Sequence, residues 1–460
     1  MAAFHSIQAG PRGRGQDQFA LLERPRRAQS GGGGGGVPQA DLPETASPPI
    51  PAFAAPAAPA GASSSRRKKG RPDIMMIGLR SVGAGQGGVE NHVDRLAGEL
   101  DRMGFRVEIV TRSLYQPGQH ERGRGITIRS LWAPRVVWAE ALVHSLLAVA
   151  YAAWRRPAIV HIHAIGPSIV APLARLAGLV VVMTHHGEDY RREKWGAAAR
   201  TVLRLGEAAG ARFSQGRIVV SPSLRASLDD RFHRPFSYIP NGVCVAGPVP
   251  GCEALRPLGL VPGRYILSVG RLVPEKRQLD LIEALAQITD PAIRLVLVGG
   301  ADHDSPYCRQ VRARAAADPR VVLAGLQSGR PLAELYSHAG VFALPSSHEG
   351  LSIALLEAMA YGNRVVASSI AANRNLGLPE ACYVPCGDVP ALARALHAAL
   401  EADRQDRLAN GGQTPRQDWG GIVDAFRWDE VAARTAGLYR AVSREGGGPS
   451  GKDDCREEGR

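Results

Sequence analysis

The stretch VFALPSSHEGLSIALLEAMAYG, residues 341–362, predicts a strand, a turn and a helix in that order. Its apolar beginning is typical of a buried strand, and the density of Leu, Ala, Ile and Met from Leu351 onward favours a helix. Glu349 then lies in the loop before the helix, and Glu357 lies roughly 12 Å further along the helix axis and about 80° around it. In an open α/β sheet such a loop stands at the carboxyl edge, where ligands bind. The two carboxylates could therefore hold an elongated ligand, although glutamates beside helices often interact only with the helix dipole or with water.

Short apolar runs alternate with amphipathic segments along most of the chain, which indicates βα units and a mainly parallel sheet. A first series of predicted strands occupies residues 74–79, 106–111, 158–164, 179–186 and 217–221. A second series occupies residues 265–272, 293–300, 321–326, 341–347 and 364–369. We expect a helix from about Val89 to Met103 after the first strand. The predicted fold class is therefore α/β with two Rossmann-like halves.

Changes in composition divide the 460-residue chain into five segments. Residues 1–72 contain six consecutive glycines and a Pro- and Ala-rich stretch, which predicts a disordered tail. Residues 73–245 form the first Rossmann-like domain, and a Pro- and Gly-rich passage leads into the second, residues 246–427. Residues 428–442 are amphipathic and predict a helix that closes the fold, followed by a disordered tail at residues 443–460.

The net charge of +13 is unevenly distributed. The first 72 residues carry +6, and residues 73–442 carry +8. This excess suits phosphorylated ligands or an anionic membrane surface. A nucleic-acid partner is not expected, because aromatic residues make up only 5% of the chain and do not alternate with arginines.

Cysteine usage and the absence of targeting signals favour a cytoplasmic protein. The six cysteines form no CxxC pair, which is simplest in a reducing compartment. The N-terminus lacks the apolar core of a secretory signal. The longest apolar window, Val136 to Trp154, is interrupted by Glu140, His144 and Ser145. We therefore expect a core or surface-docking helix there rather than a membrane span.

The loop after the first strand contains Gly83, Gly85 and Gly88, which satisfy the spacing GxGxxG before a helix. A dinucleotide site would also need an acidic residue at the end of the next strand, whereas that strand ends at Thr111 and Arg112. A dehydrogenase is therefore disfavoured. The glycines still allow the backbone to approach a phosphate at the helix N-terminus, or they simply form a tight turn.

The second half begins with SVGRLVPEKRQLD, residues 268–280, in which Arg271 and Lys276 follow a strand. Both cations could clamp a diphosphate across from the glycine loop, although isolated pairs of this kind are usually solvated. Cations in this position could neutralise a leaving diphosphate without a metal ion. His161 and His163 share one face of a strand, but no third ligand is evident in the sequence, so we expect a core or cleft-edge role and no metal site.

Taken together, these residues resemble the retaining glycosyltransferases of the GT-B fold, family 4, over residues 74–442. The most specific motifs are GGVE at 87–90, GRLVPEK at 270–276 and PSSHEGLSIALLEAMAYG at 345–362. IPNGV at 239–243 and THHGEDYRREKWG from Thr184 are consistent with them. The second of these is similar to a bacterial subgroup that acts on cell-surface polysaccharides. The resemblance implies two Rossmann-like domains that face each other across a cleft.

The resemblance also implies roles for individual residues. Glu349 would contact the donor sugar and Glu357 the nucleotide ribose, while Arg271 and Lys276 would bind the diphosphate. One histidine of the THHG segment, His185 or His186, would lie near the donor sugar, and we assign His185. The further residues expected to bind the donor are Gly87, Gly88, Gly350, Leu351, Ser352 and Asn241. Asp189, Arg191 and Lys194 are expected on the acceptor side.

The sequence thus predicts a metal-independent, cytoplasmic glycosyltransferase that needs no cofactor. Its partners would be a nucleotide sugar and a lipid-linked or glycan acceptor, with peripheral contact at the inner membrane face. A sugar-nucleotide epimerase of the same fold and an inactive scaffold protein are the alternatives. The chain departs from the family at Arg277, where a glycine is common, and at Asn375, where an acid is usual.

Overall fold

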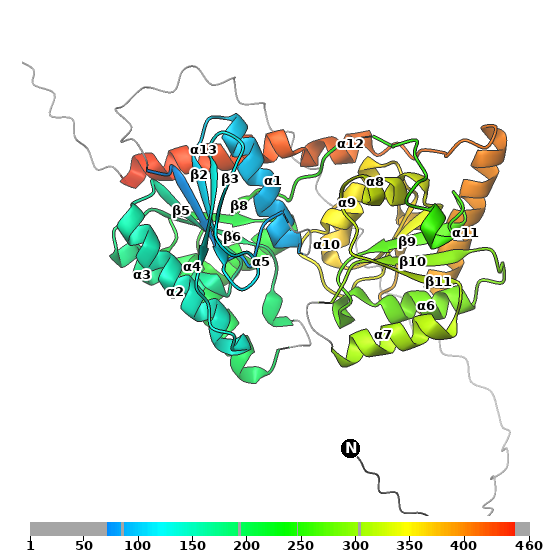
Figure 1. Cartoon of the computed structure of the whole chain (residues 1–460), viewed down its shortest axis with the longest axis horizontal. Coiled ribbons are helices and arrows are strands. Elements are labelled where there is room, and N and C mark those ends of the chain that lie inside the picture. The colour runs from blue at the N-terminus through cyan, green and yellow to red at the C-terminus, as the bar shows by residue number, and fades with distance from the viewer. Residues whose placement is uncertain (1–70, 84–86, 192–194, 246, 302–304, 447–460) are drawn as a thin grey trace, which may run out of the picture. The chain divides into compact units, whose positions relative to one another are not determined.

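The computed structural model describes residues 71–83, 87–191, 195–245, 247–301 and 305–446. The predicted disordered tails therefore lie outside the described residues, apart from residues 71–72 and 443–446. The described chain forms two separate β-sheets, one of eight strands and one of six (Figure 1). Helices cover both faces of each sheet, so the predicted α/β class with two Rossmann-like halves is confirmed.

The first sheet has the strand order β3-β4-β2-β1-β5-β6-β7-β8, and every neighbouring pair is parallel except β3 with β4. All five strands predicted for this half are present, because each is an apolar run that becomes buried on both faces. The sheet also contains three strands that the sequence analysis did not predict, β3, β4 and β8. Its strands are β1 Ile74–Ile77, β2 Val107–Arg112, β3 Gln119–Arg122, β4 Ile126–Leu131, β5 Ile159–His163, β6 Val181–His185, β7 Gly216–Val219 and β8 Ser237–Tyr238.

The second sheet is entirely parallel, with the order β11-β10-β9-β12-β13-β14. It contains the five predicted strands of the second series and the unpredicted edge strand β14. The strand order reverses direction between β9 and β12, which makes their carboxyl ends the switch point where ligands bind in such sheets. The strands are β9 Tyr265–Val269, β10 Arg294–Val298, β11 Val321–Gly325, β12 Val341–Leu344, β13 Val365–Ser368 and β14 Tyr383–Val384.

Apolar side chains alternate between the two faces of each sheet and so form separate cores. In the first sheet, Met76 packs toward α1 and α13, whereas Met75 packs toward α2 and α3. In the second sheet, Leu267 belongs to the core beneath α8 and α9, and Ile266 belongs to the core beneath α6, α7 and α11. The main helices are α1 Gly88–Arg102, α2 Val137–Arg155, α3 Ala171–Leu176, α4 Ala197–Phe213, α5 Pro222–Phe232, α6 Gln278–Ala286, α7 Pro306–Ala317, α8 Gly329–His338, α9 Ile353–Ala360 and α11 Val389–Ala409.

The last helix, α13 Trp428–Gly446, returns to the first sheet. Trp428 and Tyr439 are buried in the same core as strand β1. A bridge between Val243 and Arg427 lies just before this helix. The helix extends four residues beyond its predicted end at residue 442. The shorter helical segments include α10 Ala371–Arg374, α12 Gly420–Val423 and the 3-10 segment η2 Asp189–Arg191.

The apolar window at residues 136–154 forms helix α2, which packs against α3 and the first sheet. Within the described residues, no helix combines the length and the apolar character that crossing a bilayer requires.

Candidate active site

Two loops at the carboxyl edge of the second sheet carry the predicted cations and the first glutamate. The loop after β9 leads into a short 3-10 turn, Pro274–Lys276, and the loop after β12 contains Glu349. The Ser347 amide donates to the carbonyl of Glu275 at 2.9 Å, which ties the loops together. Lys276 Nζ then donates to Glu349 Oε1 at 2.6 Å. Residues 73 positions apart thus form a partly buried ion pair.

Arg271 lies in the same loop, two residues after the end of β9. Its carbonyl accepts a hydrogen bond from Gln278 Nε2 at 2.8 Å. The neighbouring Leu272 amide donates to the Gly300 carbonyl at 2.9 Å, which joins this loop to the loop after β10. These hydrogen bonds fix the backbone of Arg271 at the carboxyl edge of the sheet.

Gly350 is packed against the backbone of the first half of the chain. A Cβ atom at Gly350 would lie 2.0 Å from the carbonyl oxygen of His186, closer than any side chain allows. Gly187 faces it, with φ of +146°, a conformation that favours glycine. The THHG and HEG segments therefore meet backbone to backbone, and both glycines are sterically required.

The residues after Gly350 begin helix α9. The Ser352 hydroxyl accepts a hydrogen bond from the Leu355 amide at 3.4 Å and caps the helix. Asn241 Nδ2 donates to the Leu351 carbonyl at 2.9 Å and so holds this loop from outside. In the part of the chain that the structure describes, the amides of Gly350 and Leu351 have no hydrogen-bond acceptor. They can therefore donate to an anion at the helix N-terminus.

Glu357 lies on α9 and is held by a residue that the sequence analysis did not select. The Tyr336 hydroxyl, from α8, donates to Glu357 Oε2 at 3.0 Å. Burial raises the pKa of the Glu357 carboxyl above its usual range. Among the described residues its other oxygen accepts no hydrogen bond, so it can accept one from a ligand.

The two histidines of the THHG segment have different surroundings. His185 is completely buried, and its Nε2 donates to Glu207 Oε1 at 2.8 Å while its Nδ1 accepts from the Gly187 amide at 3.2 Å. Both of its ring nitrogens are therefore occupied. His186 is only partly buried, and it is its carbonyl that touches Gly350. His186 is thus the more accessible ring beside the donor loop.

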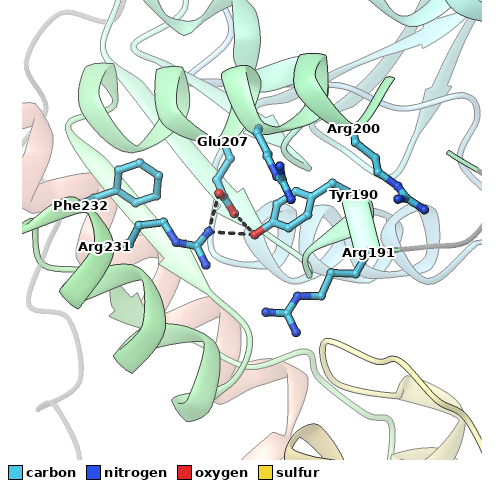
Figure 2. A pocket seen from close by; sticks show the side chains of 7 residues that line it. Tyr190, Arg191, Arg200, Glu207, Arg231 and Phe232 are labelled. Carbon is cyan, nitrogen blue, oxygen red and sulfur yellow. Dashed lines mark hydrogen bonds and ion pairs between the residues drawn. The ribbon is translucent and has the colours of Figure 1, made fainter. Parts of the chain in front are cut away.

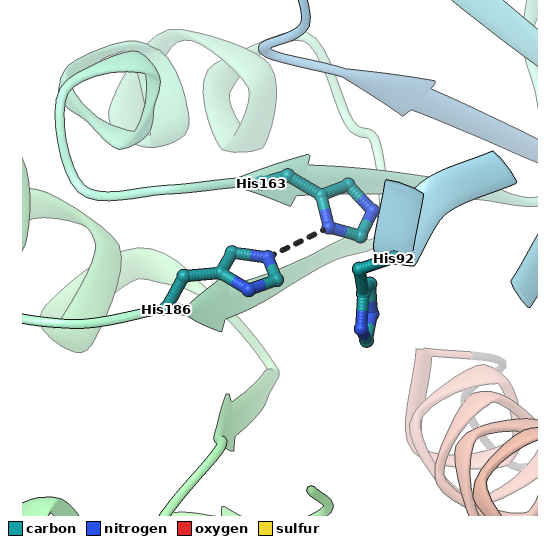
Figure 3. Close-up of side chains that lie close together, drawn as sticks. All are labelled: His92, His163 and His186. Carbon is teal, nitrogen blue, oxygen red and sulfur yellow. Dashed lines mark hydrogen bonds between the residues drawn. The ribbon is translucent and has the colours of Figure 1, made fainter. Parts of the chain in front are cut away.

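His92, His163 and His186 form a cluster that joins α1, β5 and the end of β6 (Figure 3). Each ring offers one nitrogen, and these three nitrogens lie within 4.8 Å of one another. The sequence analysis paired His163 with His161 and found no third ligand; the two rings that the structure brings beside His163 come from distant segments of the chain. Burial lowers the pKa of each of these histidines, to about 3 for His186, so the rings stay neutral at pH 7. Three neutral imidazoles are a donor set that could hold Zn²⁺.

The other predicted residues lie on the first half of the chain. Gly88 begins α1, and a Cβ atom at Gly87 would lie 2.0 Å from the Glu90 carboxylate, which folds over it. Asp189 and Arg191 lie in the short η2 turn, where Arg191 Nε donates to Glu188 Oε2 at 2.6 Å. Lys194 lies outside the described residues.

Family models of known proteins match both halves of the chain. Residues 86–246 match the family model described as Glycosyltransferase Family 4, and residues 263–402 match the one described as Glycosyl transferases group 1. The two matches together span well over half of the chain. The sucrose-phosphate synthase from Thermosynechococcus elongatus has a similar structure, with a TM-score of 0.68, 25% identity and coverage of 81% of this chain and 100% of that chain. The chain belongs to the GT-B glycosyltransferases.

Two sequence relatives illustrate how far the similarity extends. A D-inositol 3-phosphate glycosyltransferase from Xylanimonas cellulosilytica is 31% identical over 47% of this chain and 52% of that protein. The match therefore spans about half the length of this relative. An alpha-maltose-1-phosphate synthase from Mycolicibacterium smegmatis is 28% identical over 62% of this chain and 79% of that protein.

One of the two departures of this glycosyltransferase from the family pattern, at Arg277, has a structural explanation. Arg277 has φ of +52°, a left-handed conformation that explains why glycine is common there. Its Nε donates to Asp280 Oδ2 at 2.6 Å, which partly offsets the strain. Asn375 Nδ2 donates to the Ser223 hydroxyl at 2.7 Å.

Sequence reasoning missed three residues that hold the site of this glycosyltransferase, namely Tyr336, Glu207 and His92. His92 and Glu207 are each the single polar residue on the buried side of an amphipathic helix, whereas Tyr336 shares the buried side of α8 with Glu334, Ser337 and His338. Such a residue in an otherwise apolar face is a signal that could have been used, because buried polar groups need partners. The identity of the partner, however, depends on the fold.

Proposed function

We propose that this protein transfers a sugar from a nucleotide-sugar donor to an acceptor hydroxyl, with retention of the anomeric configuration. The observation that carries the proposal is the pair of Lys276 and Glu349 beside Gly350, at the carboxyl edge of the second sheet. A cation, a carboxylate and two amides without acceptors lie together there. These are the groups needed to bind a diphosphate and the sugar attached to it.

In this proposal the amides of Gly350 and Leu351 and the side chains of Arg271 and Lys276 bind the diphosphate. Glu349 accepts hydrogen bonds from the donor sugar, and Glu357 accepts them from the ribose. Tyr336 supports the ribose contact, since its hydroxyl occupies only one of the two oxygens of Glu357. A nucleotide sugar fits this order of groups along α9 and its preceding loop, because its diphosphate lies between the sugar at one end and the ribose at the other.

Catalysis would come chiefly from stabilising the negative charge that develops on the departing diphosphate. Lys276 is already oriented by Glu349, so little reorganisation is needed when that charge forms. The leaving phosphate oxygen would accept the proton of the acceptor hydroxyl as the new bond forms on the same face of the sugar. No metal or cofactor is required for these steps.

Of the two histidines, we assign the sugar contact to His186, because both ring nitrogens of His185 already have partners. His185 instead positions the Gly187 backbone that faces Gly350. This refines the expectation from sequence, which named His185 and left His186 as the alternative.

The acceptor would be a lipid-linked sugar or a glycan of a bacterial surface polysaccharide. An exposed apolar stripe on α2 supports contact with a membrane surface, because Leu142, Leu146 and Trp154 follow one face of the helix at four- and eight-residue intervals. Trp154 is 76% exposed, and Leu176 on the neighbouring α3 is 84% exposed. Arg156, which is exposed, lies at the same end of α2 and could meet anionic headgroups. We place the enzyme in the cytoplasm, in peripheral contact with the inner membrane face.

A screen of UDP, GDP and ADP sugars by thermal stabilisation tests the donor assignment, since a ligand selective for the folded state raises the melting temperature. We expect one nucleotide class to stabilise the wild type, and not Lys276→Ala. Product analysis with the selected donor then separates the alternatives. A sugar-nucleotide epimerase would convert the donor without an acceptor, whereas an inactive scaffold would bind no nucleotide sugar at all.

A further inference from the structure

A cavity of about 710 Å³ lies in the first half of the chain, outside the proposed donor contacts (Figure 2). Its walls come from the η2 turn and from helices α4 and α5. Four arginines and two aromatic rings dominate the lining, which consists of Tyr190, Arg191, Arg200, Arg204, Glu207, Arg231 and Phe232. Guanidinium groups in such a lining are suited to binding an anionic group.

One side of this arginine cavity is a fixed ion-pair network. Arg231 donates to Glu207 Oε2 at 2.8 Å and to Glu188 Oε1 at 3.1 Å. The buried Tyr190 hydroxyl donates to Glu188 Oε1 at 2.5 Å and accepts from Arg231 at 2.8 Å. Arg191 pairs with Glu188 as well. These bonds neutralise Arg191 and Arg231 and hold the Tyr190 ring in place.

The other side of the cavity carries positive charge that is not neutralised. Arg200 and Arg204 form no ion pair within the described part of the chain. The Arg204 guanidinium lies over the Tyr190 ring, 5.2 Å from its centroid. Both arginines are on α4, one helical turn apart, so their guanidinium groups can reach one anion together. Planar guanidinium groups bind phosphate oxygens through paired hydrogen bonds.

The arginine cavity is linked to the proposed donor site by Glu207. The same carboxylate that binds Arg231 accepts the hydrogen bond of His185, whose Nδ1 holds the Gly187 amide. Gly187 in turn faces Gly350. Tyr190, a lining residue of the cavity, is thus only three residues after Gly187, which contacts the donor loop.

We propose that the arginine cavity binds the phosphate or diphosphate group of a phosphorylated acceptor, with Arg200 and Arg204 as its ligands and Tyr190 as its floor. This inference rests on the proposed function, because it assigns the acceptor of the same transfer reaction. The shared chemistry is a phosphate ester, and it could belong to a soluble sugar phosphate or to a sugar carried on a lipid diphosphate.

Binding of inorganic pyrophosphate, measured by calorimetry, tests the proposal because pyrophosphate should occupy both the donor site and the arginine cavity. Wild type should bind two equivalents. Lys276→Ala should lose the donor-site equivalent, and the double variant Arg200→Ala/Arg204→Ala should lose the other, with affinity reduced at least about tenfold. The double lysine variant keeps the charge and should bind with intermediate affinity. Arg394→Ala, which removes an exposed arginine on α11, is the matched control and should bind as the wild type does.

Each outcome has a distinct meaning. If the double alanine variant binds pyrophosphate as tightly and with the same stoichiometry as the wild type, the acceptor assignment is overturned while the donor site stands. If Lys276→Ala has no effect but the double variant does, the donor assignment fails and an anion site at α4 remains. Competition with glucose 1-phosphate and with farnesyl diphosphate then separates the two sources. Tighter displacement by farnesyl diphosphate indicates a lipid-linked acceptor, and tighter displacement by glucose 1-phosphate a soluble one.

Discussion

Lys276 Nζ lies 2.6 Å from Glu349 Oε1, although one residue follows strand β9 and the other follows strand β12. These strands are neighbours in the second sheet, so the loops at their carboxyl ends meet. The pair has its charges balanced before any ligand arrives. A diphosphate that approached it would engage Lys276, and Glu349 would then accept hydrogen bonds from a sugar.

Replacing either partner should therefore abolish transfer and leave the fold intact. We expect Lys276→Ala and Glu349→Ala each to lower kcat by at least about 10²-fold, since each removes charge stabilisation at the reacting centre. Glu349→Gln keeps the shape and one hydrogen-bond acceptor, and should retain more activity than Glu349→Ala. Circular dichroism serves as the folding control. Wild-type turnover in Lys276→Ala would refute the assignment.

The contact between Gly350 and His186 predicts that Gly350→Ala is harmful. The new methyl group would fall 2.0 Å from the His186 carbonyl oxygen, so the backbone must shift. We expect a loss of about 1–3 kcal/mol in the free energy of unfolding and weaker donor binding. Gly98→Ala is the matched control, because a Cβ atom at this position on α1 meets no atom within 4 Å and alanine favours a helix. Equal stability of the two variants would show that the close approach is not maintained in solution.

The left-handed conformation of Arg277 predicts an unusual response to substitution. Arg277→Gly relieves backbone strain and loses the ion pair with Asp280, so we expect unchanged or slightly greater stability. Arg277→Val keeps the strain, adds a β-branched side chain and should cost about 1–2 kcal/mol. Urea titrations of both variants measure the difference. A valine variant as stable as the glycine variant would mean that the φ angle at this residue is not positive.

His144 predicts a pH dependence of stability. Burial lowers the pKa of this histidine to about 4 in the folded protein, and its Nε2 donates to the Thr111 carbonyl at 3.0 Å. An unfolded histidine titrates near pH 6.5, so between about pH 6.5 and 4 only the unfolded state binds the proton. Stability should therefore fall as the pH drops through this window, by up to about 1.4 kcal/mol per pH unit from this group alone.

The variant His144→Gln isolates that contribution, since glutamine can still donate to the Thr111 carbonyl but does not titrate. Unfolding by urea at several pH values between 7 and 4 should give a shallower decline for this variant than for the wild type. His397→Gln, which removes an exposed imidazole on α11, is the control. An identical decline in His144→Gln and wild type would contradict the prediction.

Removal of metal ions should not affect transfer, because Arg271 and Lys276 supply the positive charge at the diphosphate. We expect the activity after dialysis against EDTA to equal that of the untreated enzyme. If activity is lost and Zn²⁺ restores it, the cluster of His92, His163 and His186 is the first place to look. In that case His163→Ala should abolish the restoration.

Much of the fold follows from local pattern. The ten predicted strands are apolar runs long enough to be buried on both faces, and each is present. Strand β4, ITIRSL, alternates apolar and polar residues and could have been recognised by that period. Strands β3 and β14 could not be predicted from a pattern of apolar residues, because β3 is entirely exposed and β14 has only two residues. Such strands form through pairing with a neighbour rather than through their own composition.

The amino-acid sequence alone determined the two α/β series, the loops that carry Arg271, Lys276 and Glu349, and the glycines that those loops require. These features depend on residues close together in the chain. Only the tertiary structure decided that Lys276 pairs with Glu349, that His185 is enclosed by Glu207 while His186 faces the donor loop, and that Arg200 and Arg204 line a cavity. Successive residues of a strand point to opposite sides, and nothing local says which side becomes the core. That choice is made when distant segments pack together, and it is there that the chemistry of the site is set.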